Sequence, residues 1–414
     1  MLHMEVRLAY ADSEIGLDVP DWVELDRYDL TACDQAVTYS DFLASINSSG
    51  GARLLEGELP LIIVNDGHRN TPTVQILEWL EKYDRRLIDA AHYLVACGTH
   101  GEPSPEHYQR IFGRFLDRIK PRLTWHDCTD LSQMVRVGTD HFKADVWVNR
   151  RVVKATKLLV LTSVEPHYFA GFTGGRKSLF PGLANRATIE RNHNQANSLE
   201  CRPLRLAGNP MAEHLDEMLR LFGPEKVFSI QVVCDAAHTI GKVFCGRIDK
   251  AFVEAVKASE ALYARSATRP YDLVVAEVRP PLDRNLYQVQ KALEHCQTAV
   301  VDGGIVAVVA ACQDGIGKRD FYDLSDEWDR ENNRPMNGVP RFGSHKLSRV
   351  LAMTRRIKVR LYSQLPDDQP RRVFYEPVHD LQALMNECLD KNNRMRLAIV
   401  HDAGHTVLKL AGAP

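Results

Sequence analysis

Polar side chains that could do chemistry gather at four places in this sequence, each directly after an apolar run typical of a strand. The first place, VNDGHRNTP, holds Asp66, His68, Arg69 and Thr71. A strand that leads into a helix start presents unpaired N–H groups and a positive dipole end, which suit an anion. The residue types alone also allow a plain turn in which Asp66 or Thr71 caps the helix.

The second place is the loop ACGTHGEP, which carries His100 two residues after Gly98. Free histidine titrates near neutrality, so a loop histidine beyond a buried strand is a candidate general acid or base. An ordinary surface histidine is the alternative.

The third place, EPHYFAGFTGGRKSLFPGLANRATIERNHN, combines His167, Arg176, Lys177 and His193 with four glycines. Glycine lets a backbone approach a ligand closely, a buried lysine can act as a nucleophile, and neutral imidazole often binds metals. The pattern G-x-x-x-x-G-K-[ST] is not met, which excludes a P-loop. A Gly-rich surface loop with solvated basic residues is the alternative, although the large apolar neighbours weigh against it.

The fourth place, RPPLDRNLYQVQKALEHC, puts Tyr287, Gln288 and Lys291 on the first turns of an expected helix. Gln288 and Lys291 are three residues apart and therefore share a face. One charge and one amide could hold a carboxylate there, and a solvated helix face is the alternative.

Together these segments resemble the nickel-dependent lactate racemase family and its 2-hydroxyacid racemase and epimerase relatives. The resemblance rests on these motifs: Asp66-x-x-Arg69-x-Thr71-Pro72, Gly98-Thr99-His100, His167-Tyr-Phe-Ala-Gly-Phe-Thr-Gly-Gly-Arg-Lys177 with Asn192-His193, Pro281-Leu282-Asp283-x-Asn285-Leu286-Tyr287-Gln288-x-x-Lys291, and Asp314-Gly315-Ile316-Gly317. The His167 and Pro281 blocks are the specific ones.

The resemblance implies an isomerase that inverts C2 of a 2-hydroxyacid by reversible hydride transfer to a nickel pincer nucleotide. This cofactor is a pyridinium-3-thioamide-5-thiocarboxylate mononucleotide, which the resemblance attaches covalently to Lys177, with His193 as a nickel ligand. His100 and His167 match the two acid/base positions. The cofactor-binding positions are Asp66, Arg69, Thr71 and Lys177, and the substrate-binding positions are Arg69, Tyr287, Gln288 and Lys291. The implied partners are proteins that make the cofactor by sulfur transfer and nickel insertion.

Other functions fit the sequence less well. A nicotinamide-dependent 2-hydroxyacid dehydrogenase needs a G-x-G-x-x-G turn between strand and helix, which is missing from the sequence. A non-catalytic paralogue or carrier of the pincer cofactor would keep Lys177 and His193, but both acid/base histidines are present too. The particular 2-hydroxyacid stays open, with lactate as the default, and Arg176 adds a cation beside Lys177.

The elements that must position these residues alternate between short apolar runs and helical patterns, which predicts an α/β fold. We expect strands near residues 60–64, 93–97 and 273–277, and helices near 105–119 and 286–296, with Thr71 as the cap of a further helix. Two α/β domains are expected, a cofactor-binding and catalytic domain over 1–268 and a domain over 269–414 that completes the substrate site. The last residues could pack back on the first domain, and the active site is expected in the cleft between the domains.

Composition narrows the class of protein. The chain is 44% hydrophobic and 26% charged with a formal net charge of −2, which disfavours a broad nucleic-acid-binding surface. The longest apolar stretch, residues 305–312, is far shorter than the roughly 20 residues that span a bilayer. No secretory signal is visible, so a cytoplasmic protein without membrane or nucleic-acid partners is expected.

Overall fold

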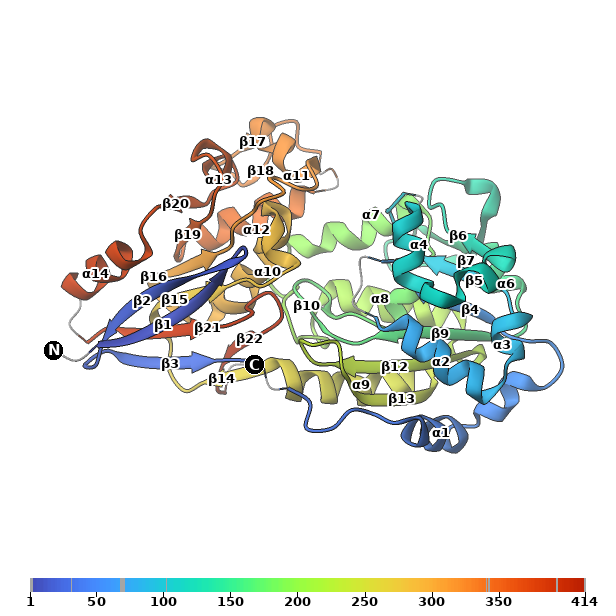
Figure 1. Ribbon diagram of the computed structural model, residues 1–414. Coiled ribbons are helices and arrows are strands. Elements are labelled where there is room, and N and C mark those ends of the chain that lie inside the picture. The colour runs from blue at the N-terminus through green and yellow to red at the C-terminus, as the bar shows by residue number, and fades with distance from the viewer. Residues whose placement is uncertain are drawn as a thin grey trace. The chain divides into compact units, whose positions relative to one another are not determined.

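The computed structural model describes residues 3–30, 32–67, 71–101, 103–339, 341, 343–391 and 394–412. They form two compact units, the first unit being Thr31–Leu262 and the second unit Met1–Leu30 with Tyr263–Pro414 (Figure 1). Two α/β domains were predicted, and this is confirmed. The division differs from the predicted 1–268 and 269–414, because the strand β3 (Glu24–Tyr28) pairs in parallel with β21 (Arg396–Val400) and draws the first residues into the second unit.

The first unit is built on a six-stranded sheet whose neighbouring strands are parallel except for the antiparallel pair β12–β13. The strands lie in the order β13 (Ile240–Arg247), β12 (Val227–Cys234), β9 (Leu158–Ser163), β4 (Leu61–Asn65), β5 (Tyr93–Ala96) and β6 (Leu123–Trp125). β4 and β5 confirm the strands predicted near 60–64 and 93–97.

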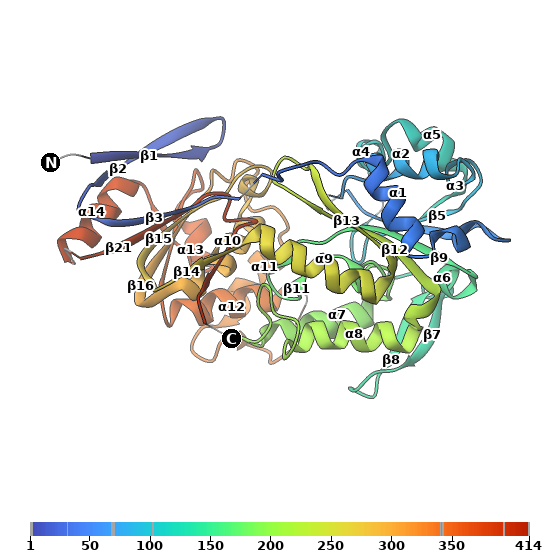
Figure 2. The ribbon, with the colours of Figure 1, turned by 90° about the horizontal axis from the view of Figure 1, so that it is seen from below.

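Alternate side chains of these strands enter two separate cores, because successive residues of a strand point to opposite faces. Ile62 and Val64 pack with the helices α1 (Tyr39–Ser48), α2 (Thr73–Tyr83), α3 (Arg86–Asp89), α4 (Pro105–Phe112) and α5 (Leu116–Ile119). Leu61 and Ile63 pack with α6 (Arg150–Lys154), α7 (Arg186–Asn194), α8 (Pro210–Phe222) and the start of α9 (Ile248–Tyr263). Figure 2 shows α2 to α5 on one side of these strands and α7 and α8 on the other.

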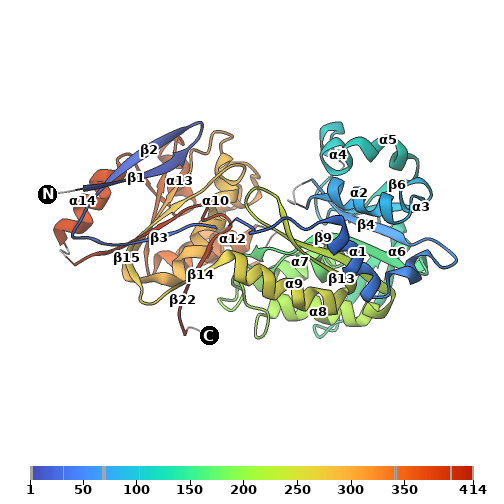
Figure 3. The same ribbon diagram turned by 60° about the horizontal axis from the view of Figure 1, so that its bottom comes forward.

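The second unit holds a fully parallel six-stranded sheet in the order β20 (Glu376–Val378), β19 (Lys358–Tyr362), β16 (Val300–Val309), β15 (Tyr271–Glu277), β21 and β3. One face packs against α10 (Leu286–Cys296), α11 (Asp320–Asp323) and α12 (Ser344–Thr354). The other face is covered by the hairpin β1 (His3–Tyr10) and β2 (Ser13–Pro20) with α14 (Leu381–Lys391), which lie together in Figure 3. The unit also contains α13 (Asp368–Arg372) and the short strands β17 (Trp328–Asp329) and β18 (Arg334–Pro335).

The last strand, β22 (Val407–Leu410), pairs in parallel with β14 (Ala264–Ala267), so it stays with the second unit. The helix predicted over 286–296 is α10, and the one predicted over 105–119 is broken at Gly113, where the positive φ of +48° ends α4. Among the residues that the structure describes, no helix is both long enough and apolar enough to cross a membrane.

Candidate active site

The chain order of the first unit's sheet reverses between β4 and β9, since β5 and β6 follow on one side of β4 and β9 and β12 on the other. Ligands of such sheets bind beyond the carboxyl ends of the strands at this switch point. Asn65 ends β4, and its amide donates to Thr162 Oγ1 at 2.8 Å and to Thr71 Oγ1 at 3.0 Å. Thr71 Oγ1 also lies 3.0 Å from Ser163 Oγ at the end of β9. The prediction that Thr71 caps α2 is therefore wrong, because its hydroxyl joins two strand ends and Pro72 occupies the cap position.

Asp66 and His100 form a side-chain pair at this edge of the sheet. Asp66 follows β4 and is buried, and its Oδ2 contacts Nδ1 of His100, which lies in the loop after β5. Because an ionised carboxylate only accepts, Nδ1 carries the proton and the lone pair lies on Nε2. The same carboxylate–imidazole arrangement holds the general base of hydrolytic triads in its reactive tautomer.

Lys177 lies in the short helix η5 (Gly175–Ser178) with its side chain nine-tenths buried. Gly174 precedes this turn with a φ of +75°, and a Cβ there would lie only 2.6 Å from the carbonyl oxygen of Ser163. Only glycine tolerates both the backbone conformation and the close approach. Gly174 therefore lets the loop pack against the end of β9, which brings Lys177 to the strand ends.

Arg176, the extra cation beside Lys177, is directed elsewhere. Its buried guanidinium pairs with Asp216 of α8 at 2.6 Å and lies 4.6 Å from the ring centroid of Phe252 on α9. Burial lowers the pKa of Arg176, and the charge of Asp216 opposes that effect. Arg176 thus holds η5 against two helices.

One pocket lies at the strand ends and brings together side chains from β4, β9, η5 and the loop after β5. Its lining comprises Asn65, Asp66, Ala96, Cys97, Gly98, His100, Thr162, Ser163, Thr173, Gly174, Lys177, Ser178, Pro181 and Gly182. Three predicted site residues, Asp66, His100 and Lys177, therefore share one cavity. A larger cavity of about 850 Å³, lined by residues 32–37 and 241–243 among others, contains none of the predicted residues.

His167 lies in the two-residue strand β10 (Pro166–His167), which pairs with β11 (Gly171–Phe172). Its Nδ1 accepts hydrogen bonds from the backbone N–H groups of Phe169 at 3.2 Å and Ala170 at 3.1 Å. The neutral ring consequently carries its proton on Nε2, the reverse of His100. His167 does not line the pocket within the described part of the chain.

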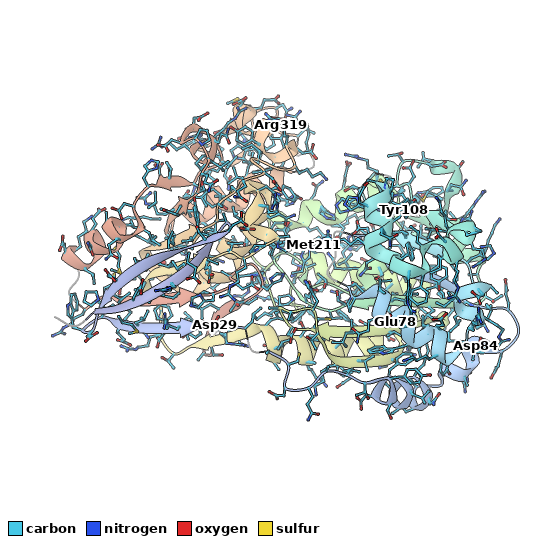
Figure 4. The ribbon with its side chains drawn as sticks, viewed as in Figure 1. Asp29, Glu78, Asp84, Tyr108, Met211 and Arg319 are labelled. Carbon is cyan, nitrogen blue, oxygen red and sulfur yellow. The ribbon has the colours of Figure 1, made fainter. Side chains whose placement is uncertain are left out.

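His193 lies on α7, and its Nδ1 donates to the carbonyl oxygen of Ile189 at 2.9 Å. A backbone carbonyl on one ring nitrogen is the usual way to direct the other nitrogen's lone pair at a metal. The preceding residue, Asn192, donates to the carbonyl oxygen of Met211 at the start of α8, labelled in Figure 4. These contacts fix α7 and place the ring proton of a neutral His193 on Nδ1.

A second group of metal-type side chains, His141, His214 and Glu217, has ligand atoms within 4.8 Å of one another. However, both ring nitrogens of His214 are already hydrogen-bonded. Nε2 donates to Asp140 at 3.0 Å, and Nδ1 faces two side-chain amides at 2.9 and 3.2 Å. Burial lowers the pKa of His214 and keeps it neutral. This group is a hydrogen-bonded support between α7, α8 and the hairpin β7 (Met134–Thr139) and β8 (Asp145–Asn149).

In the second unit, the first turns of α10 carry Tyr287, Gln288 and Lys291, as predicted. The N–H of Gln288 is capped by the Asn285 side chain at 3.2 Å, and those of Leu286 and Tyr287 donate to carbonyls of residues 315–316. Since the protein satisfies these backbone donors, an anion here must be held by side chains. Arg69, the remaining predicted substrate ligand, lies outside the described residues.

Sequence reasoning missed Asn65, Thr162, Ser163 and Ser178, although all four line the pocket. Ser178 Oγ donates to Asn65 Oδ1 at 3.2 Å, which completes the amide's hydrogen bonds. A usable signal was present, because Asn65, Thr162 and Ser163 interrupt otherwise apolar strands at their carboxyl ends.

Known proteins are similar to this chain in sequence and in fold. Residues 42–201 match the lactate racemase N-terminal domain, and residues 267–339 match the lactate racemase C-terminal domain. The lactate racemase of Thermoanaerobacterium thermosaccharolyticum is 27% identical over 345 residues, which cover 80% of this chain and 79% of that protein. The lactate racemase of Lactiplantibacillus plantarum is 29% identical over 306 residues, which cover 70% and 71%.

Two solved structures share the fold. The lactate racemase apoprotein from Thermoanaerobacterium thermosaccharolyticum aligns over 98% of this chain and 100% of its own, with a TM-score of 0.84 and 22% identity. A crystal structure of a protein from Thermotoga maritima aligns over 93% of this chain and 100% of its own, with a TM-score of 0.66 and 17% identity.

The matched domains and the relatives define an isomerase of the racemase class. The two domain matches together span more than half of the sequence, and the chain belongs to the lactate racemase family, which confirms the resemblance seen in the motifs.

This family uses a nickel cofactor in general, so the residues can be tested for fit. A buried lysine lines the pocket, where small residues (Ala96, Gly98 and Gly182) leave room and hydroxyl-bearing side chains make part of the wall polar. His193 offers an imidazole whose tautomer suits a metal. The pocket thus offers a buried lysine, and His193, which is not among its lining residues, offers an imidazole on α7, and both side-chain types are compatible with a nickel-containing group.

Proposed function

We propose that this chain inverts C2 of a 2-hydroxyacid, and lactate is the first substrate to test because the named relatives are lactate racemases. The observation that supports this most directly is the pair of Asp66 and His100 in the same pocket as Lys177. A base held by a buried carboxylate next to a buried lysine suits proton transfer beside a covalently held cofactor.

The proposed cofactor is the nickel pincer nucleotide, joined to Lys177 and ligated through nickel by His193 Nε2. When bound, this group would supply the hydride acceptor for C2. His100 Nε2 accepts the hydroxyl proton of the substrate, and Asp66 stabilises the imidazolium that results. His167 presents Nε2–H and donates a hydrogen bond to the substrate oxygen while C2 is planar. To act as a base itself, His167 would have to give up the bonds that its Nδ1 accepts from the backbone.

Cationic and amide side chains would hold the substrate carboxylate. We assign this role to Arg69, Tyr287, Gln288 and Lys291, since charge-assisted hydrogen bonds are strong and fix orientation. The proposed partners are the proteins that make and insert the cofactor, and a cytoplasmic location remains a prediction from the sequence.

The test is to produce the protein with and without the cofactor-making proteins, and to measure intact mass, nickel content and the optical rotation of lactate, malate and longer 2-hydroxyacids. We expect added mass, nickel and loss of optical rotation only in the protein made with them. Lys177→Ala, made in the same way, should lack all three. Added mass and nickel without racemisation of any acid would instead favour the non-catalytic carrier. Absence of added mass would refute the cofactor assignment.

A further inference from the structure

Four buried polar side chains join α10 to α12 in the second unit: Gln290 and Glu294 on α10, and Lys346 and Arg349 on α12. Each is at least 97% buried. Arg349 binds the carboxylate of Glu294 through Nε at 2.7 Å and Nη2 at 2.6 Å. Burying several charged groups is costly unless each is hydrogen-bonded. We call these four side chains the α10–α12 seam and ask what function offsets this cost.

Lys346 connects the seam to the predicted substrate-holding turn. Its Nζ donates to the carbonyl oxygen of Tyr287 at 3.0 Å and to Gln290 Oε1 at 3.2 Å, and it lies 4.0 Å from the ring centroid of Tyr287. The amide of Gln290 donates in return to the carbonyl oxygen of Lys346 at 3.3 Å. Lys346 therefore restrains both the backbone and the ring of Tyr287, the residue next to Gln288.

We propose that Lys346 is a positioning residue for the substrate carboxylate: its ammonium holds the first turn of α10 in place and adds positive charge beside Lys291. This inference rests on the proposed function, because it assumes that Tyr287, Gln288 and Lys291 bind a 2-hydroxyacid. Lys346 itself does not touch the substrate in this proposal. Instead, a carboxylate binds more tightly when Lys346 is protonated.

The surroundings of Lys346 make its charge sensitive to pH. The pKa of Lys346 is lowered to about 7, mainly by burial and also by the charges of Lys291 on α10 and Lys318, while the charge of Glu294 opposes this shift. Arg349 of α12 shares the charge of Glu294 through the two hydrogen bonds above. A carboxylate arriving at Lys291 adds negative charge, so binding should pull a proton onto Lys346, and by linkage the protonated form should bind the carboxylate better.

The experiment uses the cofactor-loaded enzyme and compares Lys346→Met and Lys346→Arg with the control Lys358→Met, an exposed lysine of β19 in the same unit. KM and kcat are measured from pH 6 to 9 with whichever 2-hydroxyacid the enzyme turns over. A one-unit rise in the pKa of Lys346 on binding corresponds to roughly a tenfold change in affinity. We therefore expect the wild-type and control KM to rise roughly tenfold with pH and the Met variant to have a high KM at every pH. The Arg variant should keep a low KM above pH 8. If Lys346 had a purely structural role, the KM of Lys346→Met would change but would still depend on pH as in the wild type.

Calorimetry provides a second measurement that needs no turnover. Oxamate, a carboxylate that cannot be racemised, is titrated at pH 7.5 in two buffers of different ionisation enthalpy. The wild type should take up a fraction of a proton on binding and Lys346→Arg should take up none. Turnover with a KM that does not depend on pH, or binding without proton uptake, overturns the inference and leaves the proposed function intact. If the protein takes up a proton on binding oxamate but racemises no acid, the role of Lys346 in carboxylate binding is supported and the proposed function is refuted. If Lys346→Met does not fold, the arginine variant and the wild-type calorimetry still decide the question.

Discussion

Replacing Asp66 with asparagine tests whether this carboxylate orients His100 or holds the cofactor. The amide keeps the volume of the side chain, but it is neutral and its NH₂ can donate to Nδ1, which would move the imidazole proton to Nε2 and remove the base. A hydrogen bond to a charged group contributes ~1.5–3 kcal/mol, or roughly 10- to 150-fold in rate. The side chain of His100 is 38% exposed. Water therefore screens the pair, and we expect a loss of about 10- to 30-fold in kcat.

The assay measures kcat, KM, nickel content and intact mass for Asp66→Asn and for Asp117→Asn, whose carboxylate is exposed on α5. We expect the Asp66 variant to keep its added mass and nickel with a KM close to wild type, and the Asp117 variant to behave as wild type throughout. Unchanged kcat would refute the orienting role. Loss of nickel and of the added mass together would return Asp66 to the cofactor-binding role that the family resemblance implies.

Four further outcomes are expected. Lys177→Ala should lose the added mass completely while its melting temperature shows that it folds, and an adduct that survives would move the attachment to another residue. His193→Ala should retain less nickel than the wild type by elemental analysis, because it removes a ligand. His167→Gln keeps an N–H donor, so its kcat should fall less than that of His100→Gln, and equal losses would contradict the opposite tautomers of the two rings. Gly174→Ala should destabilise the fold by about 1–3 kcal/mol, seen in thermal unfolding, because its φ is positive and its Cβ would meet a carbonyl oxygen at 2.6 Å.

Local patterns predicted the central strands and helices well because their signals lie within a few residues. The apolar run before Asn65 gave β4, and α10 begins and ends at the predicted residues 286 and 296. The N-terminal strands were not predicted at all. Their partners are distant in sequence, since β3 pairs with β21 some 370 residues later, and the register of such a pair is not encoded in either strand alone.

Residue types at the site were predictable for the same local reason, but their partners were not. The glycines around Lys177 indicated a closely packed backbone, and the structure identifies the neighbours as the end of β9 for Gly174 and the ring of Phe252 on α9 for Gly175. Thr71 shows the limit of this reasoning. A threonine before a proline and an apolar helix is a good capping signal, yet a hydroxyl at the switch point between two strands can satisfy more polar groups than a cap can.

Protonation states depend on contacts that a list of motif residues does not specify. His100 and His167 are the same residue type and match equivalent acid/base positions, but Asp66 fixes a proton on Nδ1 of one, whereas two backbone N–H groups exclude it from Nδ1 of the other. Asp66 lies 34 residues from His100 in sequence, while the donors to His167 lie two and three residues after it. Assigning the tautomer of His100 required the strand order of the sheet, whereas assigning that of His167 required only the tight turn that follows it. The fold therefore gives opposite tautomers to two histidines that a motif treats as interchangeable, and substitutions that keep only an N–H will test whether one acts as a base and the other as a donor.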